Sequence, residues 1–499
     1  MVSMAFFAVL SLLGFFSRKI FIDCLGAEVL GLNTTATNIL EILNLAELGI
    51  GGAVAYFLYK PLHHGDHDTI CDIVTLQGHF YRRIALGMIG ASVVIMAFFP
   101  WIFHKMTLPL WYAYASYAAL LFSTFLGYFV NYRQILLTSA QMDYKIRYTH
   151  TAWMIVKILC QMAAVKFLPF PYVAWVVLEF LFAIIAARSL HRATVEAFPY
   201  LTESKKTFRD LREEYGEILT KVKQIFVHRL TGVATQQTSP LIIYAYISLR
   251  MVAVYGNYLI LFSSLTRLCG ALFTSMSASV GDLVAEGNEA KIRGVFKELF
   301  ASRFVLCATI IFTILTCCQG LVKLWMGPEY VLPYSTLLII SCTYFITILR
   351  GTVDNFLNAY GLYRDVWAAV AEASINIGLS LVLGYFWGLN GILSGVTISL
   401  VLIIGIWKPY FLFHSGIKIS VWHYFRLLGM LSALAIFVGT AIAWLASLLP
   451  FSPGDSWVWL FVCAGCYALL FAVLLTVCTC FFDLGMKQFL LRMKNQVIK

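Results

Sequence analysis

Long apolar runs fill this chain almost from end to end, and nearly all of them are long enough to cross a lipid bilayer. Of its 499 residues, 61% are hydrophobic and 12% are charged, against roughly 45–50% and 25% in soluble domains. A water-soluble fold could not bury so much apolar surface. We therefore predict an integral membrane protein and treat membrane transport as the first functional hypothesis.

Windows of about 20 apolar residues match a hydrocarbon core about 30 Å thick, and they predict about 14 transmembrane spans. Backbone groups in lipid need internal partners, and the connections are short, so we predict an all-α polytopic membrane protein rather than a β-barrel. The predicted spans are 1–22, 34–58, 84–103, 111–131, 150–167, 172–187, 225–248, 252–276, 304–322, 334–351, 366–387, 391–408, 424–449 and 458–481.

The longest polar stretch divides these spans into two six-helix lobes, and two C-terminal helices follow the second lobe. Mixed charges at helical spacing in this stretch indicate an amphipathic linker helix on the cytoplasmic face, or else a solvated connector. Two short similarities, between Val29–Asn33 and Val254–Tyr258 and between Ala140–Lys145 and Ala359–Arg364, together favour two parallel repeats. The predicted parts are an N-terminal lobe (1–187), a cytoplasmic linker (188–224), a C-terminal lobe (225–408), two additional spans (424–481) and a basic cytoplasmic tail (482–499).

Lysine and arginine residues concentrate in alternate predicted loops, as the positive-inside rule requires. With both termini cytoplasmic, the outer loops keep little more than Lys105, Arg250 and Lys323. The net charge of +11 then fits cytoplasmic loops facing anionic lipid headgroups, so no nucleic-acid partner is needed. No cleavable signal peptide is expected, because Met1 opens directly into an apolar run without a basic lead-in.

Four short segments carry a family resemblance: residues 25–33, 45–51, 58–61 and 127–134. They resemble the signature of bacterial polysaccharide-transport proteins, the O-antigen and capsule flippases of the multidrug/oligosaccharidyl-lipid/polysaccharide exporter superfamily. The block 45–61 is the most specific part of this resemblance. The span count and the two-lobe layout are similar across essentially the whole chain.

The resemblance implies a flippase rather than an enzyme. Such a protein moves a polyprenyl-pyrophosphate-linked oligosaccharide across the inner membrane by alternating access. The implied partners are this lipid-linked glycan, membrane lipids, a coupling cation or proton, and a glycan polymerase. The implied location is the bacterial inner membrane, with multiple passes and both termini cytoplasmic.

A diphosphate headgroup calls for cations, and ionisable residues inside spans usually face an interior or a water-filled space. Arg267 is the first candidate, because it lies near the middle of its span and its guanidinium suits bidentate phosphate contacts. Its alternative is a structural pair with an acid such as Glu47 or Asp354. Arg18 and Arg229 are further substrate-binding candidates, with snorkelling to the membrane surface as their alternative.

Three carboxylates are candidates for ion coupling or for fixing the geometry of a lobe: Glu47, Glu372 and Asp354. Glu47 belongs to the family signature and precedes glycines that permit close helix approach. Its two readings are a proton- or cation-coupling group and a helix-packing hydrogen bond. Glu372 and Asp354, with Asn376, form a second polar group with the same two readings.

No metal site or cofactor is predicted. His63–Asp68 has metal-ligand residue types, but it occupies a short polar loop where such residues are expected anyway. The 12 cysteines lie mostly inside predicted spans and behave there as small apolar side chains. No glycine-rich phosphate loop of the ATPase type is found.

Three alternative functions remain. A multidrug or cation antiporter of the same superfamily would favour carboxylates in its cavity and needs only about 12 spans. A peptidoglycan-precursor flippase is not separated by these residues. A glycan polymerase or ligase would need a sizeable outer loop to hold an active site, and the outer segments predicted here are short.

Overall fold

The computed structural model describes residues 2–44, 50–140, 142–218, 222, 238–274, 276–362, 365–448 and 450–497. Within these ranges every regular element is a helix, which confirms the all-α prediction. The chain divides into two compact units, which we call the N-terminal unit (Met1–Ala253) and the C-terminal unit (Val254–Lys499). The division falls inside helix α12 (Leu249–Thr274). The lobe ranges 1–187 and 225–408 stay a prediction.

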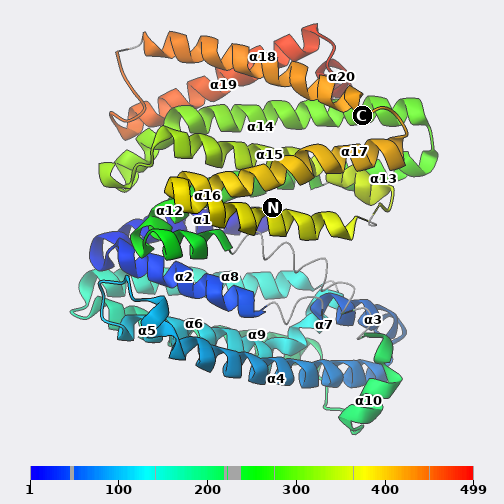
Figure 1. The fold of residues 1–499 in the computed structure, drawn as a ribbon. Helices are drawn as coiled ribbons and strands as arrows, with labels where there is room; N and C mark the ends of the chain where they lie inside the picture. The colour runs from blue at the N-terminus through cyan, green and yellow to red at the C-terminus, as the bar shows by residue number, and fades with distance from the viewer. Residues whose placement is uncertain are drawn as a thin grey trace. The chain divides into compact units, whose positions relative to one another are not determined.

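In the N-terminal unit, α8 packs against α9 and α1, and α6 packs against α2 and α9 (Figure 1). Its helices are α1 (Val2–Leu25), α2 (Ala27–Leu43), α3 (Ile50–His64), α4 (His67–Ala97), α5 (Phe99–Ile102), α6 (Trp111–Phe129), the 3-10 turn η2 (Asn131–Gln134), α7 (Ile135–Ser139), α8 (Asp143–Phe167), α9 (Pro171–Ala197) and α10 (Phe208–Glu214).

In the C-terminal unit, α14 packs against α15 and α19, and α15 packs against α16. After α12 its elements are α13 (Met276–Glu286), α14 (Glu289–Trp325), η3 (Pro328–Tyr330), α15 (Tyr334–Ala359), α16 (Val366–Leu400), the π-helical turn η4 (Val401–Trp407), α17 (Lys408–Leu412), the π-helical turn η5 (Phe413–Ile417), α18 (Trp422–Ser447), α19 (Trp457–Phe481) and α20 (Met486–Val497).

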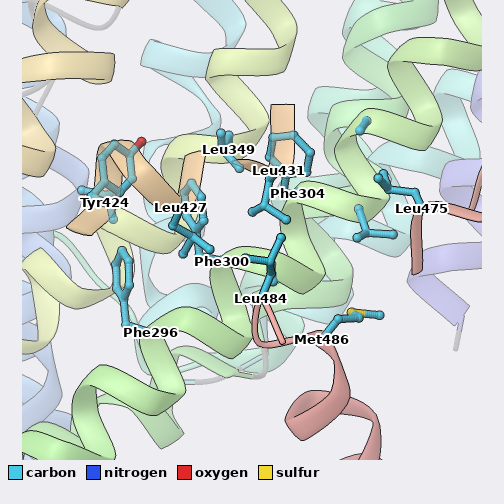
Figure 2. Close-up of a cluster of buried hydrophobic side chains, with 14 of the residues drawn as sticks. Phe296, Phe300, Phe304, Leu349, Tyr424, Leu427, Leu431, Leu475, Leu484 and Met486 are labelled. Atoms are coloured by element: carbon cyan, nitrogen blue, oxygen red, sulfur yellow. The ribbon is translucent and has the colours of Figure 1, made fainter. Parts of the chain in front are cut away.

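The core of the C-terminal unit is built on one face of α14. Phe296, Phe300 and Phe304 recur every four residues and therefore lie on the same side of the helix. Figure 2 shows these rings beside Leu427 and Leu431 of α18, and the rings of Phe300 and Phe304 are fully buried. This packing joins the two C-terminal helices, α18 and α19, to the rest of the unit.

Helix α16 is a hairpin that reverses at Gly388. This residue has φ +56° and ψ −131°, which are not helical values. The Ser380 hydroxyl donates to the Ile392 carbonyl at 2.9 Å, whereas residues 12 apart in a straight helix would be about 18 Å apart. A Cβ at Gly395 would collide with the backbone of Ser380, so small residues let the two arms touch. The arms correspond to the predicted spans 366–387 and 391–408.

Eight of the described helices are long and apolar enough to cross a membrane, and a ninth is obtained by joining Trp111–Phe129 to Tyr132–Ser139 across a 56° bend. One of the eight, Trp367–Ile417, contains the hairpin and so holds two predicted spans. The other predicted spans fall on described helices, with three exceptions. The span 34–58 is divided between α2 and α3, with 45–49 outside the described residues, and the span 84–103 begins in the middle of α4 and includes α5. Only 238–248 of the span 225–248 is described. The chain is thus a multi-pass membrane protein.

The predicted linker begins within α9, because residues 188–197 continue that helix, and the described part of 198–224 includes α10, with seven residues. A capping box between Thr207 and Asp210 starts this helix. Asp72 of α4 binds the segment, because its carboxylate lies 2.7 Å from Lys206 Nζ and accepts from the Tyr215 hydroxyl at 3.4 Å. The linker is therefore docked on α4.

The tail is also docked. Arg492 of α20 lies 3.2 Å from the carboxylate of Glu298 on α14, and Lys297 donates to the Asp483 carbonyl. These contacts anchor the basic tail to the first turns of α14, which extend beyond the predicted span 304–322.

Candidate functional site

Two of the six predicted site residues, Glu47 and Arg229, lie outside the described residues. Arg18 lies in α1, and its Nη2 donates to the Ala253 carbonyl at 3.0 Å. A carbonyl is a neutral dipole, so this bond satisfies one donor of the guanidinium without neutralising its charge. Arg18 therefore ties α1 to the first turn of α12.

Arg267 lies in α12 and is exposed. It lies within electrostatic range of the Tyr344 hydroxyl of α15, and within the described part of the chain it has no ion-pair partner. Of the two acids expected as structural partners, Asp354 is paired with Arg350 instead, and Glu47 lies outside the described residues. Arg267 is thus a cation without a described counter-ion, in a helix long and apolar enough to cross a membrane.

Asp354 and Arg350 are one turn apart on α15. Arg350 Nε donates to Asp354 Oδ2 at 2.8 Å, and both side chains are about one-third exposed. Glu372 of α16 lies within electrostatic range of this pair and of Lys408. Lys408 Nζ in turn lies 2.8 Å from Asp365 Oδ2, at the start of α16. The two predicted carboxylates therefore share one polar group.

Arg303 was not among the predicted site residues, because the predicted span 304–322 begins one residue after it. The structure places Arg303 inside α14, where it is 8% exposed. Its Nη1 donates to the Ile348 carbonyl at 3.3 Å, and its guanidinium carbon lies 4.3 Å from the ring centre of Phe273. Arg303 also lies within electrostatic range of Asp354. The spacing of Phe296, Phe300 and Phe304 was the available signal that the helix begins before this arginine.

Six of the charged residues described above interact with one another in the C-terminal unit, and we call them the charge cluster. It balances three cations against three acids and draws them from α14, α15, α16 and α17. Buried or half-buried charges in lipid persist only when they are paired or functional. Adding a proton or a cation at Glu372 or Asp354 would disturb this balance, which is the chemistry that ion coupling needs. The members are Arg303, Arg350, Asp354, Asp365, Glu372 and Lys408.

Among its described residues, the N-terminal unit contains one ion pair between apolar helices. Lys157 Nζ of α8 contacts both carboxylate oxygens of Glu179 on α9, at 2.8 and 3.2 Å. Glu179 is 9% exposed. The pair joins the two helices that pack together most extensively in this unit, so it has a structural role.

The family-signature residues 25–33 hold the first helices together. Glu28 accepts a hydrogen bond from the Thr107 amide at 2.6 Å, which ties α2 to the loop before α6. The Ser116 hydroxyl donates to Asn33 Oδ1 at 2.6 Å. A Cβ at Gly31 would overlap the Leu249 carbonyl, so only glycine permits α2 and the start of α12 to approach this closely.

The histidine-rich segment is structural. Asp66 caps α4 by accepting from the Thr69 amide at 3.1 Å and from its hydroxyl at 2.7 Å, and these bonds hold the pKa of the Asp66 carboxyl below its usual range. The ring of His67 lies 3.7 Å from that of Tyr200. Among the described residues, no group of three or more histidine, cysteine, aspartate or glutamate side chains could hold a metal ion.

Comparison with known proteins gives the fold. No family model and no curated relative matches the chain. Among solved structures, the lipid II flippase MurJ in an inward closed conformation has a TM-score of 0.65 at 12% identity, covering 97% of this chain and 98% of its own. An inward-facing multidrug resistance MATE transporter of the MOP superfamily has a TM-score of 0.61 at 13% identity, covering 82% and 95%.

The MATE multidrug transporter DinF-BH is also similar, with a TM-score of 0.54 at 16% identity and coverage of 83% and 93%. At these identities the likeness shows the fold alone. The chain has the fold shared by these transporters.

Proposed function

We propose that this protein is a flippase that moves a polyprenyl-pyrophosphate-linked oligosaccharide, an O-antigen or capsule repeat unit, across the bacterial inner membrane by alternating access. The observation that supports this most is the full-length likeness to a lipid flippase. That match leaves 3% of the chain uncovered, about 15 residues. Helices α18 and α19 hold 26 and 25 residues, so the part of the chain that matches the flippase includes most of these two helices.

The similarity to drug transporters covers less of this chain, and this difference supports the flippase proposal. The MATE match leaves 18% of this chain uncovered, about 90 residues. An antiporter of cationic drugs also needs unpaired carboxylates, whereas Asp354 and Glu179 are paired with Arg350 and Lys157. Both the difference in coverage and the pairing of these carboxylates favour a lipid-linked substrate over a cationic drug.

The cations supply the substrate chemistry. A diphosphate headgroup carries negative charge into the membrane, and an arginine fork binds phosphate through two parallel hydrogen bonds. Arg267 is available for this role, since the described residues provide no ion-pair partner for it. Arg18 and Arg229 are proposed as helpers in substrate binding. Glu372, Asp354 and Glu47 are proposed for coupling to a proton or cation, or for holding lobe geometry.

A peptidoglycan-precursor flippase is the second candidate, because the structure with full-length similarity is named for lipid II. Both substrates share a polyprenyl diphosphate, so the arginines do not separate them. Residues 45–61, with their resemblance to polysaccharide-transport proteins, favour the first proposal. In either case we expect no catalytic residues, a multi-pass protein with both termini cytoplasmic, and a glycan polymerase as a partner downstream.

Replacement of Arg267 tests this proposal in cells that make the surface glycan. Arg267→Ala should abolish surface polysaccharide while protein abundance stays near normal. Arg267→Lys should rescue only partly, because lysine is a point charge without the planar fork. The control is Arg293→Ala, which removes an exposed arginine paired with Glu289 on α14. This variant should leave export intact. Normal export with Arg267→Ala would contradict the assigned role.

A further inference from the structure

A polar pocket of about 550 Å³ lies within the N-terminal unit. This volume falls in the range of roughly 300–1,000 Å³ typical of small-molecule sites. It is lined by the end of α2, by the start of α3, by α4, by the last turns of α6, and by η2, α7 and the start of α8. Part of its wall, Gly127 to Gln134, belongs to the family signature.

The described part of the wall is neutral. Amides come from Asn44, Gln77 and Gln134, hydroxyls come from Ser123, Thr124 and Thr138, and three tyrosines, two glycines and two isoleucines complete the described wall. None of the described residues that line the pocket carries an ionisable acid, a lysine, an arginine or a histidine. A phosphate would need cations here and a cationic drug would need carboxylates, so the lining suits an uncharged polar ligand.

The aromatic rings give the pocket flat walls. The rings of Tyr81 and Tyr128 lie 5.3 Å apart and are tilted by 48°. A Cβ at Gly78 would lie 2.9 Å from the ring of Tyr132, so glycine lets this third ring lie directly against α4. Sugars present apolar ring faces that pack on aromatic side chains and hydroxyl edges that exchange hydrogen bonds with amides.

Gln77 gives an independent indication of a ligand. It is 1% exposed, and its Oε1 accepts no hydrogen bond from the described residues. A buried amide oxygen without a donor is rare in folded proteins and costs stability. Gln77 lines the pocket but its Oε1 is buried, so a ligand hydroxyl would donate to this oxygen once the amide turns toward the pocket.

The predicted depth of the pocket in the membrane also supports a sugar ligand. Gln77 and Tyr81 precede Arg82 and Arg83 on α4, which the positive-inside pattern predicts to mark the cytoplasmic boundary. The sugars of a lipid-linked glycan, before they are flipped, lie at that boundary. We propose that this pocket is a subsite for neutral sugar residues of the transported glycan, with Gln77 accepting a sugar hydroxyl. The inference rests on the proposed flippase function.

The test uses the full-length protein in lipid nanodiscs and saturation-transfer NMR. The probes are the neutral methyl glycosides of glucose, galactose, mannose and N-acetylglucosamine, with methyl glucuronide and glucosamine as charged comparisons. At least one neutral glycoside should bind, and Gln77→Leu should weaken that binding by about tenfold. The matched control is Gln161→Leu on α8, since Gln161 is 8% exposed and its Nε2 is also unpartnered among the described residues but lies outside the pocket.

Ser123→Ala provides a second variant that should fold normally, because Ser123 is exposed on α6 and lines the pocket. It should weaken the same glycoside severalfold. Equal effects of Gln77→Leu and Gln161→Leu, stronger binding of a charged sugar, or no binding of any neutral glycoside would overturn the sugar subsite. Translocation of a glycan lipid at the native rate by Gln77→Leu would overturn it while leaving the flippase function standing. Binding of a neutral sugar by a protein that translocates no glycan lipid would support the pocket as a sugar site and contradict the flippase function.

Discussion

The guanidinium of Arg303 occupies the space that a side chain at Gly351 would fill, because a Cβ at residue 351 would collide with Nη1. Arg303 lies on α14 and Gly351 on α15, one residue after Arg350 of the charge cluster. The absence of a side chain at one position thus allows the charge at the other to enter the helix interface.

Gly351→Ala should therefore displace Arg303 and destabilise the C-terminal unit by about 1–3 kcal/mol, as overpacking of an interior does. The matched control is Gly378→Ala on α16, where a new Cβ meets nothing within 4 Å. Thermal unfolding of both variants in the same detergent would show the difference. An equal midpoint for the two variants would mean that Arg303 is not held in this position.

The pair between Lys157 and Glu179 should behave as a buried ion pair. Lys157→Met alone leaves an uncompensated carboxylate and should cost about 3 kcal/mol, whereas the double variant with Glu179→Leu should recover most of the loss. Lys19→Met, which removes an exposed pair with Asp23, should cost less than about 1 kcal/mol. Additive effects in the double-mutant cycle would show that the two side chains do not interact.

Asp72→Asn should release the linker from α4, because it removes the charge that holds Lys206. Hydrogen exchange in 198–218 should accelerate, while Arg209→Gln, at an exposed pair with Glu213, should leave the exchange unchanged. Unchanged exchange in Asp72→Asn would show that other contacts hold the linker in place.

Acid should loosen the same segment. The Thr207 hydroxyl and amide hold the pKa of Asp210 below its usual range, so the charged cap stabilises α10 above about pH 4 and is lost as the pH falls through the lowered pKa. The carboxylates of Asp72 and Glu214 raise the pKa of Lys206, so that its contribution persists through neutral and mildly alkaline pH. The protection factors of amides in this segment, which are corrected for the intrinsic pH dependence of exchange, should therefore stay constant from pH 7 to about pH 4 and fall at lower pH.

Reporter fusions test the predicted orientation. Fusions after Gly65 and within 200–215 should report a cytoplasmic location, and a fusion after Pro328 should report a periplasmic one. The reason is the concentration of lysine and arginine in alternate loops. A periplasmic signal from 200–215 would require an odd number of crossings before the linker and would contradict the two-lobe arrangement.

Helix positions could be predicted from the sequence because apolar runs set them. The reading placed a break between 387 and 391, and Gly388 is the residue that turns there. The phenylalanine spacing indicates that α14 begins before Arg303, and the helix does contain 14 residues before it. The burial of the Arg303 side chain could not be predicted, since a charge next to an apolar run normally marks the end of a span. Its position depends on Gly351, 48 positions away, and such a pairing is invisible without coordinates.

The candidate site was foreseen only in part. The grouping of Glu372 with Asp354 was expected from their common depth, but Arg350 and Lys408 were not recognised as their partners. The polar pocket of the N-terminal unit combines amides, hydroxyls and tyrosines from several helices, and none of them is unusual in its own segment. Its residues 127–134 were noted for family resemblance, which carries no information about the cavity that they line.

Translocation in liposomes tests the flippase proposal most directly. The purified protein would be reconstituted with a fluorescent polyprenyl-diphosphate oligosaccharide, and exposure of the label to a membrane-impermeant quencher would be followed alongside the mass of the glycan. The account predicts protein-dependent transfer between leaflets, with the mass unchanged and the rate sharply reduced by Arg267→Ala. Transfer no faster than in protein-free vesicles, or a glycan that is lengthened or moved to another acceptor, would contradict it.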